Sequence, residues 1–284
     1  MNKSFISILI LLLYFNIAYG QITNPKFASY LSDKELYNDI ILLSKNKTEH
    51  LDNHQLDSLE FYTGWAFYNA QELEKSINSF MNVGFESNFY LQSRFLTIWS
   101  EYYLGNTRKG LTILEQCKPE SIDENELLLM FQTGGSLMLR EMDKAENLLK
   151  LSNTKKNKYS KQWDRMELHY TKIDRFNPKS YTMAGILSGI IPGAGKIYAG
   201  QKGAGTSSLL LVGALAAITL ENGFKKGWTK WNTITSASFL SVFYVGNIYG
   251  SIVSVKIYRD RFYDEVDRAI LLDLNIPLRD IYRK

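Results

Sequence analysis

A set of apolar and aromatic residues recurs at a fixed distance in the N-terminal half of the chain. The first copy and its repetition 34 residues later comprise Phe61, Trp65, Tyr68, Phe95, Trp99 and Tyr102. A third copy follows after a further 35 residues, with Met130 and Leu137 at matching positions. A period of this length indicates stacked copies of one supersecondary unit that bury a continuous core between them. We therefore expect helical hairpins over residues 57–152, with a weaker copy before them.

Small residues occupy one equivalent position in the three copies. They are Ser76, Gly110 and Ala145, each in the second helix expected after a turn such as Leu104-Gly105-Asn106. Two helices can cross closely only where side chains are small, since a larger group would push the pair apart. The spacing and pattern resemble the tetratricopeptide repeat (TPR). The copies depart from that family, because its usual glycine in the first helix is present only as Gly64 and no proline closes a unit.

The TPR resemblance implies a groove lined by the first helices of the repeats, which in that family binds peptides or protein segments. Carried over by position, the groove residues are Trp65, Tyr68, Asn69, Trp99, Tyr102 and Tyr103. The alternative is that these aromatic side chains fill the core between repeats. Neither interpretation implies catalysis.

A helical stripe follows the repeats. Its apolar residues are spaced four, three, four and three apart and are Tyr159, Trp163, Met166, Tyr170 and Ile173. Such a stripe on a charged segment suits a helix that caps the open end of a stack. We expect His169, on the same helix, to be solvated. The repeat domain with its capping helix should cover residues 21–177.

The N-terminus has the pattern of a secretory signal peptide. Lys3 precedes the uncharged apolar run Phe5–Ala18, and Ala18-Tyr19-Gly20 has the form of a cleavage site. We expect residues 1–20 to be removed and the repeat domain to lie outside the cytoplasm, in the cell envelope. The alternative is an uncleaved anchor, for which the apolar run is short. Cys117 is the single cysteine, so the chain has no internal disulfide and no cysteine-rich metal site.

Three stretches beyond residue 180 carry no charge, namely Ser180–Gly195, Gly203–Leu220 and Trp231–Val255. As helices they would extend roughly 24, 27 and 37 Å, against a hydrocarbon core of about 30 Å. We expect a helical membrane domain over residues 178–258 with two or three membrane helices, and the side of the C-terminus stays open. Gly246, Gly250 and Ser254 line up for close helix packing.

The glycine-rich run in this domain is not a nucleotide site. A phosphate-binding loop needs Gly-Lys followed by Ser or Thr, whereas Ile197 follows Lys196. The run resembles the turn motif of TM2-type bacterial membrane domains, a family without an agreed activity. Its motif residues are Pro192, Gly193, Gly195, Tyr198, Gly200, Gly203 and Gly205. Glycine permits positive φ and close backbone approach, so the chain can reverse where helices cross. Lys196 and Lys202 would lie at headgroup level and favour anionic lipid.

No residue pattern indicates catalysis, a cofactor or a metal. His50 and His54 share a helix face but lack a third ligand, and no serine or cysteine is paired recognisably with a histidine. The basic residues are scattered among acids, which argues against nucleic acid as a partner. The charged tail over residues 259–284 is expected to be a solvated helix.

The sequence therefore predicts an all-α chain, a TPR-like helical-hairpin solenoid followed by a helical membrane domain. The expected function is that of a non-enzymatic, membrane-anchored scaffold that recruits an unidentified protein partner and self-associates through its membrane domain. The alternative is a membrane-transport or membrane-protein-insertion accessory that acts through the glycine-rich hairpin. An enzyme is disfavoured, because ionisable residues expected at an intramembrane site are missing from the three uncharged stretches.

Overall fold

A computed structural model describes residues 25–45, 51–152 and 158–282, and over these residues it contains thirteen helices and no strand. The expected signal peptide lies outside the described residues. The chain divides into two compact units. The repeat unit comprises the described residues up to Asp174 and from Arg268 to Tyr282, and the apolar unit comprises Arg175–Asp267. The predicted all-α class is confirmed for the described part.

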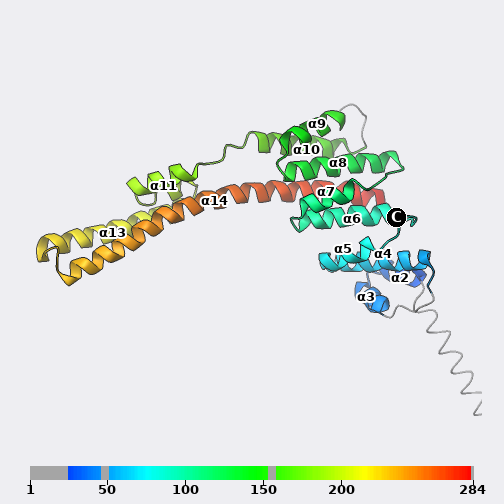
Figure 1. Cartoon of the computed structure of the whole chain (residues 1–284), viewed down its shortest axis with the longest axis horizontal. Coiled ribbons are helices and arrows are strands. Elements are labelled where there is room, and N and C mark those ends of the chain that lie inside the picture. Colours follow the sequence, from blue (N-terminus) through cyan, green and yellow to red (C-terminus); the bar gives the residue numbers. More distant parts are fainter. Residues whose placement is uncertain (1–24, 46–50, 153–157, 283–284) are drawn as a thin grey trace, which may run out of the picture. The chain divides into compact units, whose positions relative to one another are not determined.

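The repeat unit consists of helices that pack as consecutive antiparallel pairs (Figure 1). The pairs and the helix that follows them are α2 (Pro25–Asp33) with α3 (Tyr37–Lys45), α4 (Asn53–Asn69) with α5 (Leu73–Met81), α6 (Tyr90–Tyr103) with α7 (Thr107–Leu114), α8 (Ile122–Met138) with α9 (Met142–Ser152), and α10 (Ser160–Asp174).

The turn inside each pair has the same backbone conformation. A residue with positive φ lies between the two helices, and these residues are Glu35 (57°), Gln71 (62°), Gly105 (82°) and Arg140 (63°). They are 36, 34 and 35 positions apart, so the period seen in the sequence is also a period of backbone geometry. The pair α2–α3 belongs to this series, as the expected weaker copy before the repeats requires.

Two of the first helices begin with a capping box. At the start of α4 the Asp52 carboxylate accepts a hydrogen bond from the backbone N–H of Gln55 at 2.8 Å. At the start of α8 Ser121 Oγ accepts one from the backbone N–H of Glu124 at 3.1 Å. In both, the side chain three residues on returns a bond to the capping residue's amide, so otherwise unpaired helix donors are satisfied. Local chemistry thus sets where α4 and α8 start.

The small residues lie at close crossings, as predicted. Ser76 and Ala145 are fully buried, and Ser76 Oγ donates to Gly64 O at 2.9 Å. A Cβ on Gly110 would lie 2.5 Å from the Tyr102 ring. Because protein interiors are close-packed, a larger side chain at these positions would separate the paired helices.

Helix α10 packs against α8 and α9, where its apolar stripe is buried or half-buried. The prediction that His169 is solvated is wrong, since its side chain is buried and contacts a carboxylate.

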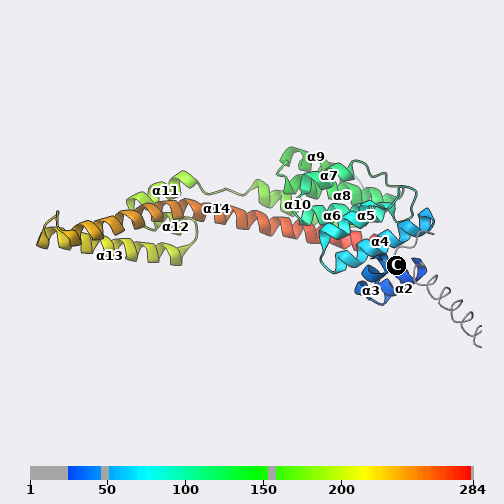
Figure 2. The same ribbon diagram turned by 60° about the horizontal axis from the view of Figure 1, so that its bottom comes forward.

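The last helix, α14 (Trp231–Tyr282), contributes to both units. Asp264 and Glu265 are exposed, in agreement with the expected solvated tail. The expectation is wrong beyond Arg268, where Ile270, Leu274 and Leu278 are buried. These residues recur every four positions and form one apolar face of an amphipathic helix. We call residues 268–282 of α14 the docked helix (Figures 1 and 2).

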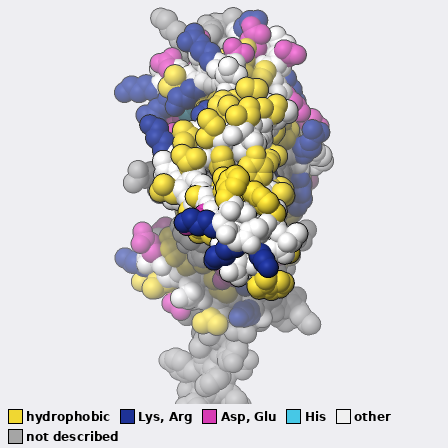
Figure 3. Space-filling view, turned by 90° about the vertical axis from the view of Figure 1, so that its left-hand side faces the viewer, with side chains coloured by type: hydrophobic (Ala, Val, Ile, Leu, Met, Phe, Trp, Pro, Cys, Tyr) yellow, Lys and Arg dark blue, Asp and Glu magenta, His cyan; other side chains and the backbone are white. Residues whose placement is uncertain are grey.

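The apolar unit contains α11 (Tyr181–Ile190), α12 (Ala194–Tyr198), α13 (Lys202–Lys226) and the part of α14 before Arg268. Helices α13 and α14 are long and apolar enough to cross a membrane, whereas α11 is shorter. Large apolar side chains such as Leu210, Val242 and Val245 are exposed on these two helices, and hydrophobic side chains gather over the unit (Figure 3). Outward-facing apolar residues on long helices suit contact with hydrocarbon.

Candidate functional site

Four of the six predicted groove residues form a continuous row of rings on α4 and α6. Trp65 stacks on Tyr68 with ring centroids 5.6 Å apart, and Tyr68 meets Trp99 edge to face at 5.4 Å. Trp99 in turn stacks on Tyr103 at 5.3 Å. We call these residues the aromatic row. Trp65 and Trp99 occupy the same position of successive copies, whereas Tyr103 occupies the position of Asn69 and not that of Tyr68.

The other two predicted groove residues lie elsewhere. Tyr102 is 1% exposed, and its hydroxyl donates to Phe131 O at 3.0 Å. Burial raises the pKa of Tyr102 above its ordinary value. This residue therefore belongs to the core between repeats, which is the alternative that the sequence left open. Asn69 is exposed and its amide donates to Trp65 O in its own helix at 2.8 Å.

The aromatic row binds the docked helix of the same chain. The Trp99 indole Nε1–H donates to Leu271 O at 3.1 Å. The Asn275 amide donates to the Tyr68 hydroxyl at 3.1 Å. Two rings of the row thus make polar contacts with the docked helix. The contacted residues, Leu271 and Asn275, are four positions apart, so they lie on the same face at successive turns.

The docked helix packs on α8 at a residue without a side chain, Gly134, which we call the glycine floor. A Cβ on Gly134 of α8 would lie 2.9 Å from Leu274 Cδ1 and 3.1 Å from Ile270 Cγ2. Both leucine and isoleucine are fully buried there. A side chain at Gly134 would force Leu274 and Ile270 to shift, so this glycine permits the close approach of the docked helix.

A buried carboxylate joins the docked helix to α10. Asp273 Oδ1 accepts from Arg165 at 2.7 Å, and its Oδ2 accepts from His169 Nε2 at 2.8 Å. Burial opposes the charge, but the bonds from His169 and Arg165 outweigh it and hold the pKa of Asp273 below its usual range. The charge on Asp273 is therefore part of how the docked helix is held.

Further contacts hold the end of the docked helix. Asp280 Oδ2 accepts from the Tyr159 hydroxyl at 2.9 Å and pairs with Lys158 Nζ at 3.1 Å. The Tyr282 hydroxyl donates to Glu124 Oε1 at 3.4 Å. Together with the aromatic row, the glycine floor and Asp273, these contacts surround the docked helix with residues of α4, α6, α8 and α10.

Part of this surface stays exposed. Tyr103 is 59% exposed, and on the outer side of the docked helix Leu272 and Ile276 are 67% and 45% exposed. Tyr103 stacks on Trp99, and Leu272 and Ile276 directly follow Leu271 and Asn275, the residues that bond to the row. Apolar side chains therefore stay exposed both at the edge of the row and on the docked helix.

The glycine-rich motif of the apolar unit forms a tight turn. Gly193 has φ of 85°, and its amide donates to Asn247 Oδ1 at 3.1 Å. A Cβ on Gly193 would collide with the carbonyl oxygen of Gly205, and one on Gly195 with that of Ala184. Gly200 also has positive φ, at 89°. The predicted roles of these glycines in chain reversal and close approach are confirmed.

Gly205 also allows a close approach, since a Cβ on it would collide with Ile197 Cγ1 and lie 2.8 Å from Gly193 O. The other motif residues are less constrained. The Tyr198 hydroxyl accepts from the Ser180 amide at 3.1 Å, and Pro192 lines a cavity. A Cβ on Gly203 would meet no described atom within 4 Å.

The three predicted helix-packing residues differ in their contacts. Gly250 lies against the Lys196 side chain, and Ser254 Oγ donates to Gln201 Oε1 at 3.0 Å. A Cβ on Gly246 would have no described atom within 4 Å, so the expected close packing at Gly246 is wrong within this chain. A polar contact that the sequence did not indicate joins Ser188 Oγ to Ser251 Oγ at 2.6 Å.

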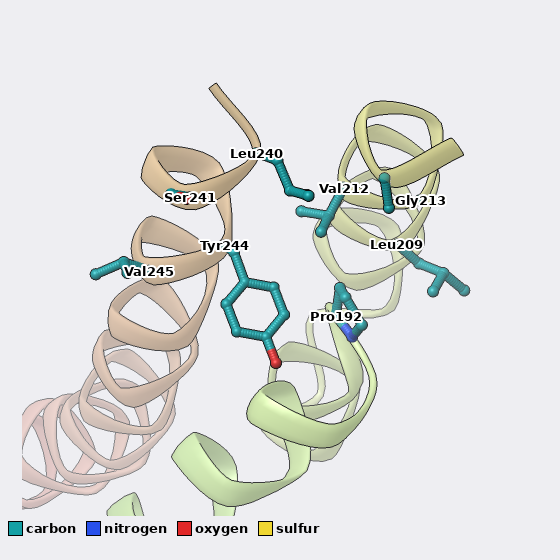
Figure 4. Close-up of a pocket in the computed structure, with 9 residues that line it drawn as sticks. Pro192, Leu209, Val212, Gly213, Leu240, Ser241, Tyr244 and Val245 are labelled. Carbon is teal, nitrogen blue, oxygen red and sulfur yellow. The ribbon is translucent and has the colours of Figure 1, made fainter. Parts of the chain in front are cut away.

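A cavity of about 540 Å³ lies between α13 and α14 (Figure 4). Its lining is largely apolar and comprises Pro192, Leu209, Val212, Gly213, Ala216, Leu240, Ser241, Tyr244 and Val245. All nine residues belong to the apolar unit.

Among the described residues, no three His, Cys, Asp or Glu side chains are grouped as a metal site would require. His50 lies outside the described residues. No family model matches the chain, and neither a curated protein nor a solved structure does.

Proposed function

We propose that this chain is a non-enzymatic protein of the bacterial cell envelope, a membrane-anchored TPR-like scaffold that recruits a protein partner. Two helices of the apolar unit, α13 and α14, support the anchor by their length and composition. Placement of the repeat unit outside the cytoplasm rests on the signal peptide expected at residues 1–20. The recurrent turn at Gln71, Gly105 and Arg140 supports the TPR-like assignment.

The observation that carries the proposal is the binding of an amphipathic helix by the aromatic row. Trp99 bonds to a backbone carbonyl of that helix, and Gly134 allows its apolar side chains to approach. These contacts use an apolar face and main-chain groups, as helix-in-groove recognition does. The surface is therefore chemically suited to helical protein segments.

The recruiting surface in this proposal combines the edge of the row with the outer face of the docked helix. Its exposed members are Asn69, Tyr103, Leu272 and Ile276. Tyrosine and large aliphatic side chains supply apolar contact area at protein interfaces. The partner that fits is a segment with an apolar face of its own, packing on the docked helix without displacing it.

Photo-crosslinking in native membranes tests this function. A crosslinking residue at position 272 should attach one partner protein, and the double variant Asn69→Ala with Tyr103→Ala should reduce that adduct at least tenfold. Ile122→Ala removes an apolar side chain that is 85% exposed and is not part of the recruiting surface, so its adduct should match the wild type. An adduct that the double variant leaves unchanged would exclude the recruiting surface.

A second function, the membrane-transport or insertion accessory, is favoured by the cavity beside Pro192. Gly195→Leu cannot test it, since a side chain there would disrupt the fold. Gly203→Leu is suitable, because no described atom lies within 4 Å of its Cβ position. If the accessory function is right, cells that carry this variant should show the same defect as cells that lack the protein, while the position-272 adduct still forms. A normal phenotype would reject it.

A further inference from the structure

The cavity between α13 and α14 offers an apolar lining in which the side-chain hydroxyls are already bound. The Tyr244 hydroxyl donates to Gly189 O, and Ser241 Oγ donates to Ala237 O at 2.9 Å. The other lining side chains are aliphatic or absent. A polar ligand would lose its bonds to water here without replacing them, which costs about 1–3 kcal/mol per group. Hydrocarbon is the chemistry that fits.

One end of this cavity carries a cation. Lys196 Nζ donates to Ser208 Oγ at 2.7 Å, and its Cε lies 3.2 Å from the Cβ position of Gly250. The Lys196 side chain is thus half-buried between α13 and α14, the two helices that form the cavity. Ser208 directly precedes Leu209 of the lining, and Gly250 lies about 9 Å beyond Tyr244 along α14, at about 1.5 Å per residue.

The ammonium group of Lys196 lacks an anionic partner among the described residues, since no carboxylate there forms an ion pair with it. Ser208 accepts one of the three bonds that an ammonium can donate. A partly buried charge is costly unless it is paired and hydrogen-bonded. An anion beside Lys196 would supply the missing acceptors.

Resting on the membrane anchor of the proposed function, we propose that this cavity binds an acyl chain of an anionic phospholipid, with the phosphate beside Lys196. The hydrocarbon fills the space lined by Val212, Gly213 and Tyr244, and the headgroup neutralises the ammonium. A single molecule with an anion at one end and a hydrocarbon chain at the other satisfies both features. Surface lysines also attract anionic lipid, but they come without a lined cavity.

Native mass spectrometry of the full chain tests the site. The protein is reconstituted in bilayers of equal phosphatidylglycerol and phosphatidylcholine, extracted in mild detergent, and its bound lipid is counted. The wild type should retain one phosphatidylglycerol at least fivefold over phosphatidylcholine. Gly213→Leu fills the cavity without a clash, since its Cβ position is open, and should reduce all retained lipid at least fivefold. Lys196→Gln should retain lipid but lose the preference for phosphatidylglycerol.

Two matched variants control for general effects. Gly246→Leu makes the same change at an open position of α14 outside the lining, and Lys226→Gln removes an exposed lysine at the other end of α13. Both should behave as the wild type. The lipid site would be overturned if Gly213→Leu retained as much lipid as the wild type, or if Lys196→Gln kept the preference for phosphatidylglycerol. It would also be overturned if the wild type were a dimer without bound lipid, or retained a free fatty acid in place of a phospholipid.

An alkaline carbonate wash of the same membranes separates the two proposals. A protein that washes out overturns the anchor and the lipid site together. A protein that stays in the membrane but retains no lipid overturns the lipid site alone.

Discussion

Trp99 Nε1 and Leu271 O form a hydrogen bond of 3.1 Å between residues 172 positions apart in the chain. The bond holds the docked helix against the residues that, by the TPR resemblance, would bind a peptide of another protein. A partner that used the whole aromatic row would first have to remove this helix. Recruitment on its outer face, next to Tyr103, requires no such step.

Trp99→Phe should loosen the docked helix, because it removes the indole donor and keeps an aromatic ring. A hydrogen bond contributes about 0.5–1.5 kcal/mol net, so local opening should become about 2- to 13-fold more frequent. Hydrogen exchange of residues 268–282, followed by mass spectrometry on the full chain in detergent, measures this. Tyr103→Phe alters an exposed ring of the same row and should leave exchange unchanged. Equal exchange in both variants would show that the bond contributes nothing.

Leu274→Ala should destabilise the repeat unit by about 2–5 kcal/mol, the usual cost of truncating a fully buried leucine. Leu272→Ala is the matched control, because Leu272 is exposed on the same helix, and it should change stability by less than about 0.5 kcal/mol. Denaturant unfolding of the full chain, followed by tryptophan fluorescence, compares them. If the two variants unfold alike, residues 268–282 do not pack as described.

The hydrogen bonds that Arg165 and His169 donate to the Asp273 carboxylate lead us to expect a loss of stability in acid. Its pKa is lowered in the folded chain, so its charge contributes stability above the unfolded carboxyl pKa of about 3.9. That contribution is lost as the pH falls through the still lower folded pKa. Unfolding free energies measured between pH 7 and pH 2 should therefore decline at the acid end of this range.

Asp273→Asn isolates this contribution. At pH 7 it should unfold about 1–3 kcal/mol more easily, because Arg165 and His169 lose a charged acceptor. Its acid decline should be shallower than that of the wild type. Parallel pH profiles would mean that other carboxylates, and not Asp273, account for the decline.

Gly195→Ala should impair folding of the apolar unit, because the added Cβ would collide with Ala184 O. Overpacking of this kind costs about 1–3 kcal/mol, which lowers the midpoint of thermal unfolding in detergent by several degrees. Gly203→Ala adds the same atom in open space and should retain the wild-type midpoint. A normal midpoint in Gly195→Ala would contradict the tight turn.

Local features of the fold could be predicted from the sequence. The period of 34–35 residues anticipated the turns, and the small residues Ser76 and Gly110 anticipated the helix crossings. The motif glycines Gly193 and Gly195 likewise anticipated a chain reversal. Each of these signals depends on neighbours in the chain or on a repeated unit, where sequence spacing carries the geometry directly.

The docked helix could not be placed in the same way. Its contacts join residues more than a hundred positions apart, such as Asp273 with His169 or Leu271 with Trp99, and periodicity within one helix does not name a partner. Charged residues before and within it favoured a solvated helix, although Ile270, Leu274 and Leu278 form an apolar face. The glycines at 134 and 135 in α8 were the other available signal, since such a pair inside a helix favours close approach of another element.

The glycine floor and the aromatic row also determine when, during synthesis, the repeat unit can finish packing. A chain emerges from the ribosome N-terminus first, so α4, α6 and α8 are complete before Ile270 and Leu274 exist. Until then the surface that Ile270 and Leu274 cover lacks its partner. The packing of the repeat unit can therefore be completed only after residues 268–282 have been translated.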